Sequence, residues 1–266
     1  MDLKRLFINT AGALAFASVA ATANAEFLDF TVDETSIPGF STTGFTFVAD
    51  NFTGKYEERI TINPDLTLNF VGVVDFTAAA VGGQSVRDSY LNSVGGYSMY
   101  AIFQGTGLFT GTGFTINSAT FDLYIDPSRE FVPTFGGGGG GGVTISDDTS
   151  DDYLIAWATD LVIGSGIPAS SGPPPSPGSF LAIWDNFTLT DNGSDPDGNK
   201  YFVEPRPFHL VVETTGDFDE DTFAPGDFTL TGDVSAAFQP VPEPPTLALM
   251  GLALLGVGAA ARRRRV

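Results

Sequence analysis

Residues 56–76 read YEERITINPDLTLNFVGVVDF, and they carry the clearest secondary-structure signal in the chain. Tyr56, Ile60 and Ile62 alternate with polar residues, which is the two-residue period of a half-buried strand. The NPD sequence at 63–65 is typical of a tight turn. A second apolar run follows over Leu66–Phe76. We therefore expect two antiparallel strands joined as a hairpin.

Similar patterns recur along the chain, separated by Gly, Pro, Asn and Asp. Alternating segments lie at Phe121–Ile125, Phe180–Thr190, Phe208–Val212 and Phe228–Phe238. The more continuous apolar run Leu154–Val162 is consistent with a central strand. Asp75–Gly82 is the one modest helix candidate, and Ser85–Ser93 is a candidate for a short helical turn.

These patterns predict an all-β fold. We expect an antiparallel two-sheet sandwich of jelly-roll type, with a closed barrel as the alternative. A single domain would span residues 26–239. Within it, Gly136–Gly142 and the Pro-rich run at 173–178 are expected to be surface loops, although the glycines would also suit a linker between two domains.

The charge balance is strongly acidic. The chain has 32 acidic and 12 basic residues. Two of the acidic and six of the basic residues lie in the terminal segments discussed below, which leaves a net charge of −24 between them. Such a field repels nucleic acid and anionic lipid, and it attracts divalent cations and cationic polymers. The acidic charge could also serve only to keep the protein soluble. There is no cysteine, which excludes disulfides and thiol nucleophiles.

The sequence shows no convincing catalytic set, and we do not expect an enzyme. His209 is the sole histidine, and a lone histidine in a strand is more often structural. No G-x-S-x-G motif is present. Glycosidases need two carboxyl groups, and nothing distinguishes a pair among the candidates Glu57, Glu58, Glu130, Glu204 and Glu213.

An Asp-rich loop is the one candidate metal site. Asp191, Asp195, Asp197 and Asn199 place oxygen ligands around flexible glycines, as a calcium loop requires, although the EF-hand pattern is not met. Asp and Asn are also ordinary turn residues. Further acidic clusters lie at Asp217–Asp221 and Asp147–Asp152.

The N-terminus has the pattern of a signal peptide over residues 1–25. Lys4 and Arg5 precede the apolar core Ala11–Ala21, and Ala23-Asn24-Ala25 is an A-x-A site for signal peptidase. We expect cleavage before Glu26. An N-terminal anchor helix is the alternative, but the core is short for one.

The C-terminal segment 241–266 has three parts in order. Pro242, Glu243 and Pro244 form a tripeptide, Leu247–Ala261 is an uncharged apolar run, and four arginines follow at Arg262, Arg263, Arg264 and Arg265. As a helix the run reaches about 22 Å, which is short for a bilayer core of roughly 30 Å. The arginines would hold that end in the cytoplasm. An ordinary transmembrane anchor is the alternative.

This arrangement resembles the PEP-CTERM sorting signal of diderm bacteria. The resemblance implies recognition of the tripeptide by the membrane protease exosortase during export. It also implies a transient inner-membrane anchor, and then an extracellular or cell-surface location.

A second resemblance covers short segments of the body of the chain. They look like the flocculation-associated group of PEP-CTERM proteins, and they lie at residues 52–58, 97–103, 121–127 and 228–232. The group implies a role in cell aggregation or floc and biofilm formation with secreted exopolysaccharide. The alternative is a secreted carbohydrate-binding module or glycoside hydrolase, for which Tyr97, Tyr100, Trp157 and Trp184 are the aromatic residues to place.

Overall fold

The computed structural model describes residues 29–111, 113–146, 149–167, 178–191, 197–204, 208–215 and 224–239. The expected signal peptide, the expected C-terminal sorting signal with its short apolar helix, and most of the Pro-rich run lie outside these ranges. The described residues form antiparallel β-structure with three short helical turns, so the predicted all-β class is confirmed.

The hairpin expected from residues 56–76 is present as β3 (Asn51–Ile62) and β4 (Thr67–Val81). Every second residue of β3 is buried along its full length. In the turn, the Asn63 amide donates to the Thr67 carbonyl at 2.8 Å, and the Asp65 carboxylate accepts from the Thr67 amide at 3.1 Å. Leu66 adopts a φ of 67° at the turn. The strand and turn signals therefore act together to set the register.

The modest helix candidate Asp75–Gly82 is wrong, because most of this segment belongs to β4 (Thr67–Val81). Ala78 and Ala79 pair with Thr53 and Phe52 of β3, and Ala79 is fully buried. Alanine favours a helix locally, but cross-strand pairing in the core overrides this weak preference. Ser85–Ser93 contains no helix either: β5 (Gln84–Ser85) pairs with the end of β4, and turns follow.

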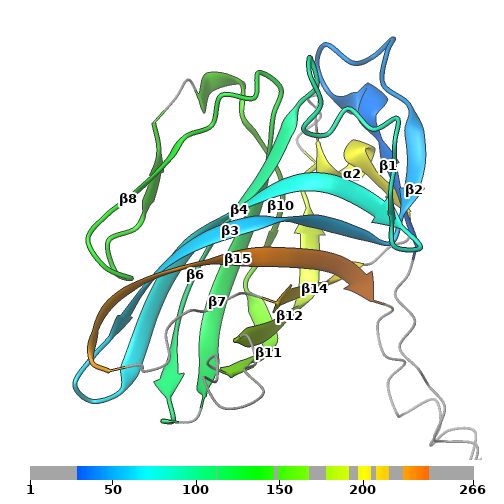
Figure 1. The fold of residues 1–266 in the computed structure, drawn as a ribbon. Coiled ribbons are helices and arrows are strands. Elements are labelled where there is room, and N and C mark those ends of the chain that lie inside the picture. Colours follow the sequence, from blue (N-terminus) through cyan, green and yellow to red (C-terminus); the bar gives the residue numbers. More distant parts are fainter. Residues whose placement is uncertain are drawn as a thin grey trace, which may run out of the picture.

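The main sheet closes on itself. Its order is β10-β12-β11-β7-β6-β4-β3-β15-β14. Pairing of β12 with β14 closes the ring from β12 to β14, and β10 pairs with both β12 and β7. Figure 1 shows β4, β3 and β15 side by side as long curved strands. The further strands are β6 (Ser98–Phe109), β7 (Phe114–Asp126), β10 (Tyr153–Ala158), β11 (Asp160–Ile167), β12 (Ser179–Leu189), β14 (Phe208–Thr215) and β15 (Gly226–Gln239).

The closed sheet has features of both the expected sandwich and its closed alternative. Opposite parts of the sheet face each other across one core, as in a sandwich, but hydrogen-bonded pairing links them as in the closed alternative. Four of the eight neighbouring pairs in this order are consecutive in the chain, and the jelly-roll type stays a prediction.

The expected single strand Leu154–Val162 is two strands. β10 pairs with the end of β7 near Phe121–Ile125, whereas β11 pairs with its start at Phe114 and Thr115. The chain bends at Thr159, whose carbonyl accepts from the Leu161 amide at 3.1 Å. The described pairings of β10 and β11 therefore leave the middle of β7, between Thr115 and Phe121, without a strand partner on the edge that faces them.

A small second sheet covers one end of the closed sheet. It contains β1 (Phe30–Asp33), β2 (Thr46–Ala49) and β13 (Phe202–Glu204), with the turns η1 (Glu34–Ser36) and α2 (Gly198–Tyr201) beside it (Figure 1). Aromatic rings fill the space beneath. Phe202 lies 6.2 Å from both Phe30 and Phe52, measured between ring centroids.

The run of seven glycines lies between β8 (Pro133–Phe135) and β9 (Val143–Ile145), which pair as a hairpin. The hairpin lies to one side in Figure 1, and η2 (Thr149–Asp151) follows it. The Gly139 amide donates to the Thr61 hydroxyl at 2.7 Å, and a Cβ atom at position 139 would overlap the backbone of Asn69. Glycine is therefore required where this loop lies on the β3–β4 hairpin.

We predict that Phe202→Ala lowers the free energy of unfolding by about 3–5 kcal/mol, because it leaves a cavity among the rings beneath the small sheet. Val203→Ala is the matched control, since Val203 is 39 % exposed and its neighbour is fully buried. Urea unfolding of the exported protein measures both. Equal, small losses for the two variants would contradict the packing described.

Candidate functional site

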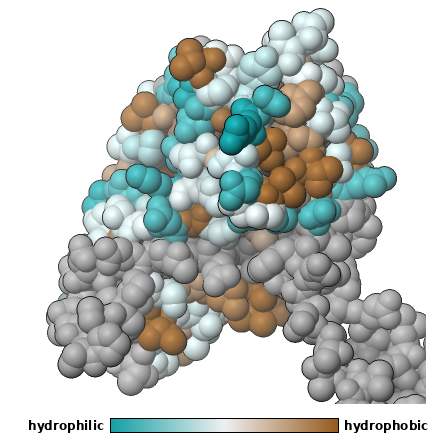
Figure 2. Space-filling model, turned by 45° about the vertical axis from the view of Figure 1, so that its right-hand side comes forward, coloured by the Kyte–Doolittle hydropathy of each residue, from teal (hydrophilic) through white to brown (hydrophobic). Residues whose placement is uncertain are grey.

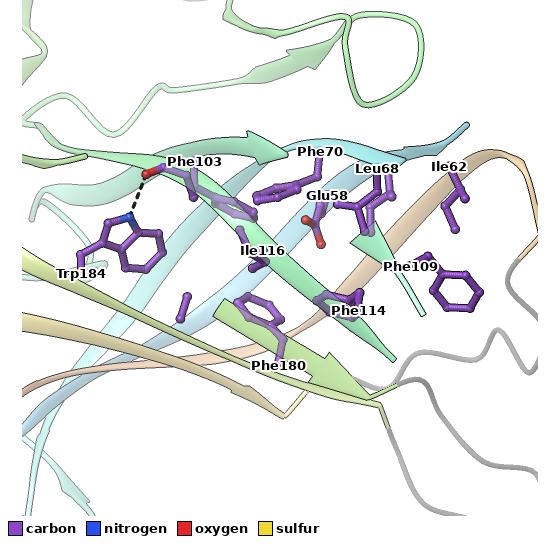
Figure 3. Close-up of a pocket in the computed structure, with 13 residues that line it drawn as sticks. Glu58, Ile62, Leu68, Phe70, Phe103, Phe109, Phe114, Ile116, Phe180 and Trp184 are labelled. Atoms are coloured by element: carbon purple, nitrogen blue, oxygen red, sulfur yellow. Dashed lines mark hydrogen bonds between the residues drawn. The ribbon is translucent and has the colours of Figure 1, made fainter. Parts of the chain in front are cut away.

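An apolar pocket opens inside the closed sheet, away from the end covered by the small sheet. The inward residues of β3 run from Phe52, beneath the small sheet, to Ile60 and Ile62 in the pocket. The space open to the centres of water-sized molecules is about 30 Å³, and all the space between the lining atoms, including the part continuous with solvent, is about 560 Å³. Its lining, drawn in Figure 3, is Glu58, Ile60, Ile62, Leu68, Phe70, Phe103, Phe109, Phe114, Ile116, Ala119, Phe180, Ala182 and Trp184.

Three phenylalanine rings of the lining are held by glycines on neighbouring strands. Phe103 pairs with Gly72, and Phe70 pairs with Gly105, across β4 and β6. Phe114 pairs in the same way with a glycine of β11 at position 166. A Cβ atom on any of these glycines would overlap the partner ring. The glycines therefore let the rings lie flat against the sheet and leave space in the middle.

Trp184 closes the wall beside the split between β10 and β11. Its indole Nε1–H donates to the Ala119 carbonyl at 3.1 Å, shown as a dashed line in Figure 3. Ala119 lies in the stretch of β7 between the pairings with β10 and β11. The indole thus satisfies a buried backbone carbonyl that faces this gap.

Glu58 is the only titratable residue of the described lining. Its side chain points into the pocket among apolar groups that include Phe70 and Ile116 (Figure 3). It is 7 % exposed, and no described residue forms a hydrogen bond or ion pair with its carboxyl group. Burial raises its pKa from 4.5 to about 8. At neutral pH the group is largely a neutral carboxylic acid, able to donate and accept hydrogen bonds.

The inward position of Glu58 follows from the alternating pattern of β3. From the sequence alone, Glu58 was only one of five candidate glutamates. It occupies the inward position between Tyr56 and Ile60. Its neighbour Glu57 lies on the opposite face, where it pairs with Arg59 at 2.9 Å. A carboxyl group that interrupts an otherwise apolar inward row was the signal that could have identified it.

The glycosidase alternative lacks a second carboxyl group here. Glu57 and Glu58 are adjacent in a strand and so point to opposite faces. Glu130 and Glu204 are not among the pocket-lining residues. Glu213 and His209 lie on β14, of which the structure describes the backbone only. Within the described lining, a two-carboxylate mechanism therefore has one of its two groups.

Three of the four aromatic residues considered for glycan binding are buried in structural roles. The Tyr97 hydroxyl is 2.8 Å from that of Tyr201 and donates to Glu34 at 3.2 Å. Tyr100 stacks between Tyr124 and Phe131, with ring centroids 5.1 and 4.6 Å away. Trp184 belongs to the pocket wall.

Trp157, on β10, is the fourth and is 38 % exposed. The other exposed large apolar residues are aliphatic and spread over several elements, and Figure 2 shows a patch of apolar residues beside hydrophilic ones on the face drawn. An aromatic row along one sheet face is therefore not present in the described part of the chain.

The proposed calcium loop is only partly described. Asp197 is buried and caps α2 by accepting from the Lys200 amide at 2.8 Å, and the Asn199 side chain donates to the Thr190 carbonyl at 3.2 Å. Asp191 is exposed, and Asp195 lies outside the described residues. Calcium binding at this loop stays a prediction, and two of its four residues already have local structural roles.

Asp126, Asp151 and Asp152 bring their carboxylate oxygens within 4.8 Å of one another. Asp126 is fully engaged: its carboxylate accepts from the Ser128 hydroxyl and from the amides of residues 129, 130 and 131, at 2.7–3.0 Å. Asp152 accepts from the Tyr100 hydroxyl at 2.7 Å. A metal ion would have to displace these bonds, so the cluster is better explained as the cap of the loop after β7.

Comparison with known proteins identifies one feature. The family described as the PEP-CTERM protein-sorting motif matches residues 240–265. No curated protein and no solved structure matches this chain significantly. The motif marks the chain as an exosortase-targeted protein that is exported through transient membrane sorting to an extracellular or cell-surface location. Within the described ranges, no helix is both long and apolar enough to cross a membrane.

The raised pKa of Glu58 makes stability depend on pH. The folded state binds this proton more tightly than the unfolded state, whose pKa is 4.5, so the group reduces stability as pH rises from 4.5 through about 8. We predict that Glu58→Gln unfolds with nearly the wild-type free energy at pH 4.5. At pH 9 the variant should be more stable than the wild type, by an amount on the order of 5 kcal/mol.

Urea unfolding at the two pH values measures this difference. Glu34, which is also buried with a raised pKa, is present in both proteins and cancels in the comparison. Glu57→Gln is the control on the opposite face of β3. A stability difference between wild type and Glu58→Gln that does not change with pH would refute the burial of this carboxyl group.

Proposed function

We propose that the exported protein is an extracellular matrix component that promotes cell aggregation, or floc and biofilm formation, together with exopolysaccharide. The sorting motif at residues 240–265 carries the proposal, because it marks the protein for export and sorting to the outside of the cell. The acidic span adds to it, since a net charge of −24 keeps such a protein dispersed and attracts cations and cationic polymers in the matrix.

The structural findings favour a binding or scaffolding role over hydrolysis. The pocket offers one carboxyl group in an apolar wall, and a sugar ring would leave its hydroxyl groups unpaired there. A carbohydrate-binding module is the second candidate, and the exposed indole of Trp157 is the observation that favours it. A glycan would then bind outside the sheet, and Trp157→Ala would abolish that binding.

We predict that deleting the gene slows cell settling without lowering total secreted polysaccharide, because the protein would organise the matrix and not synthesise it. Complementation with the wild type should restore settling. A Glu243→Ala variant should remain in the membrane as a precursor and fail to restore it. Settling assays, polymer quantification and mass spectrometry of the medium measure the three effects.

Normal settling of the deletion strain would remove the matrix role. The purified exported protein should also leave the polysaccharide intact. Release of reducing ends that is abolished by Glu58→Gln would establish the hydrolase alternative instead.

A further inference from the structure

We infer that the pocket inside the closed sheet binds a small hydrophobic amine, with its ammonium group on the Glu58 carboxyl group and its apolar part against the phenylalanine rings. This inference is independent of the matrix role, because it concerns the interior of the sheet and not the outer surface or the sorting signal.

The position of Glu58 provides the first argument. A carboxyl group buried among apolar side chains without a described partner loses the hydration that would stabilise its charge. A bound cation restores that stabilisation through an ion pair of charge-assisted hydrogen bonds. No other titratable group is part of the described lining, so no side chain of that wall can supply the cation.

The walls provide the second argument. Phe70, Phe103, Phe114, Phe180 and Trp184 surround the pocket, and aromatic faces attract cations and pack against apolar groups. Glycines on neighbouring strands hold three of these rings back and keep the interior open. A polar sugar or a multiply charged ion would find no further hydrogen-bonding side chain here besides Glu58 and the indole, whose N–H already donates to Ala119.

The net charge of the protein provides the third argument. The chain as a whole carries a charge of −20, so its overall field repels an anionic ligand such as a fatty acid. The same field attracts a cationic ligand, and Glu58 loses its proton and pairs with the cation once it is bound. Charge and apolarity together therefore select an amine with an apolar tail.

The proton balance of binding follows from the state of Glu58. Its pKa of about 8 leaves the free carboxyl group mostly protonated at pH 6.5. When an ammonium ion binds, the carboxyl proton passes to the buffer and the carboxylate pairs with the cation. Binding at pH 6.5 should thus release close to one proton for each amine bound, and no bond other than this O–H bond is broken.

Calorimetric titration of the exported protein with octylamine, 1-octanol and octanoate tests the inference, because the three probes share one tail. Octylamine should bind best, and octanoate should not bind. Titration in two buffers of different ionisation enthalpy should show the proton release. In a Trp157→Phe background Trp184 is the sole tryptophan, so its fluorescence reports whether the probe enters the pocket.

Matched variants separate the carboxyl group from the rest of the protein. Glu58→Gln should weaken octylamine binding by about tenfold to a hundredfold and abolish proton release, while octanol binding is unchanged. Glu57→Gln, on the outer face, should leave octylamine binding unchanged. If Glu58→Gln binds octanol as tightly as the wild type and keeps the same circular dichroism spectrum, the variant is folded.

Four results would overturn the inference. They are the absence of octylamine binding, binding that Glu58→Gln leaves unaltered, binding without proton release, and octanol or octanoate binding as tightly as octylamine.

Discussion

The pairing of β12 with β14 is the constraint on which the rest of the structure depends. Without it the long antiparallel sheet would have two free edges and an exposed apolar face. With it the sheet has an interior, and the inward row of every strand becomes a core residue or a pocket wall. The small sheet of β1, β2 and β13 then covers one end, and aromatic packing fills the interior beneath it.

The two halves of this interior differ in how their aromatic residues are used. Beneath the small sheet, rings such as Phe30 and Phe202 contact one another and are fully buried. In the pocket, Phe70, Phe103 and Phe114 lie against glycines of adjacent strands, and the rings of Phe70 and Phe103 also contact each other, with centroids 6.3 Å apart. Strand glycine has an entropic cost, and here its effect is to keep an apolar space open around Glu58.

Much of the architecture could be predicted from the two-residue alternation of apolar side chains and from the Gly, Pro, Asn and Asp residues that mark turns, because both are local properties of the sequence. The β3–β4 hairpin, the strands near residues 121–125, 180–190 and 228–238, and the loop of glycines all lie where the patterns placed them. The predictions failed where contacts between distant parts of the chain determine the secondary structure. Three alanines in Asp75–Gly82 favour a helix alone but form a strand when β3 is beside them, and the split at Thr159 depends on two separate pairings with β7.

The candidate site was harder to predict for the same reason. Glu58 sits in a clear inward row, yet only closure of the sheet makes that row an interior with a vacant centre. Tyr97, Tyr100 and Trp184 looked equally suited to bind glycans until their burial was known. The sorting motif needed no fold, since a linear tripeptide, apolar run and arginine cluster are read directly from the chain.

The most direct test of the account is an NMR titration of the Glu58 side-chain carboxyl carbon in the exported protein, assigned with Glu58→Gln. A carboxyl group enclosed by the closed sheet should titrate with a pKa near 8. A midpoint near 4.5, the value for an exposed glutamate, would show that this side chain lies in water and that the sheet has no such interior.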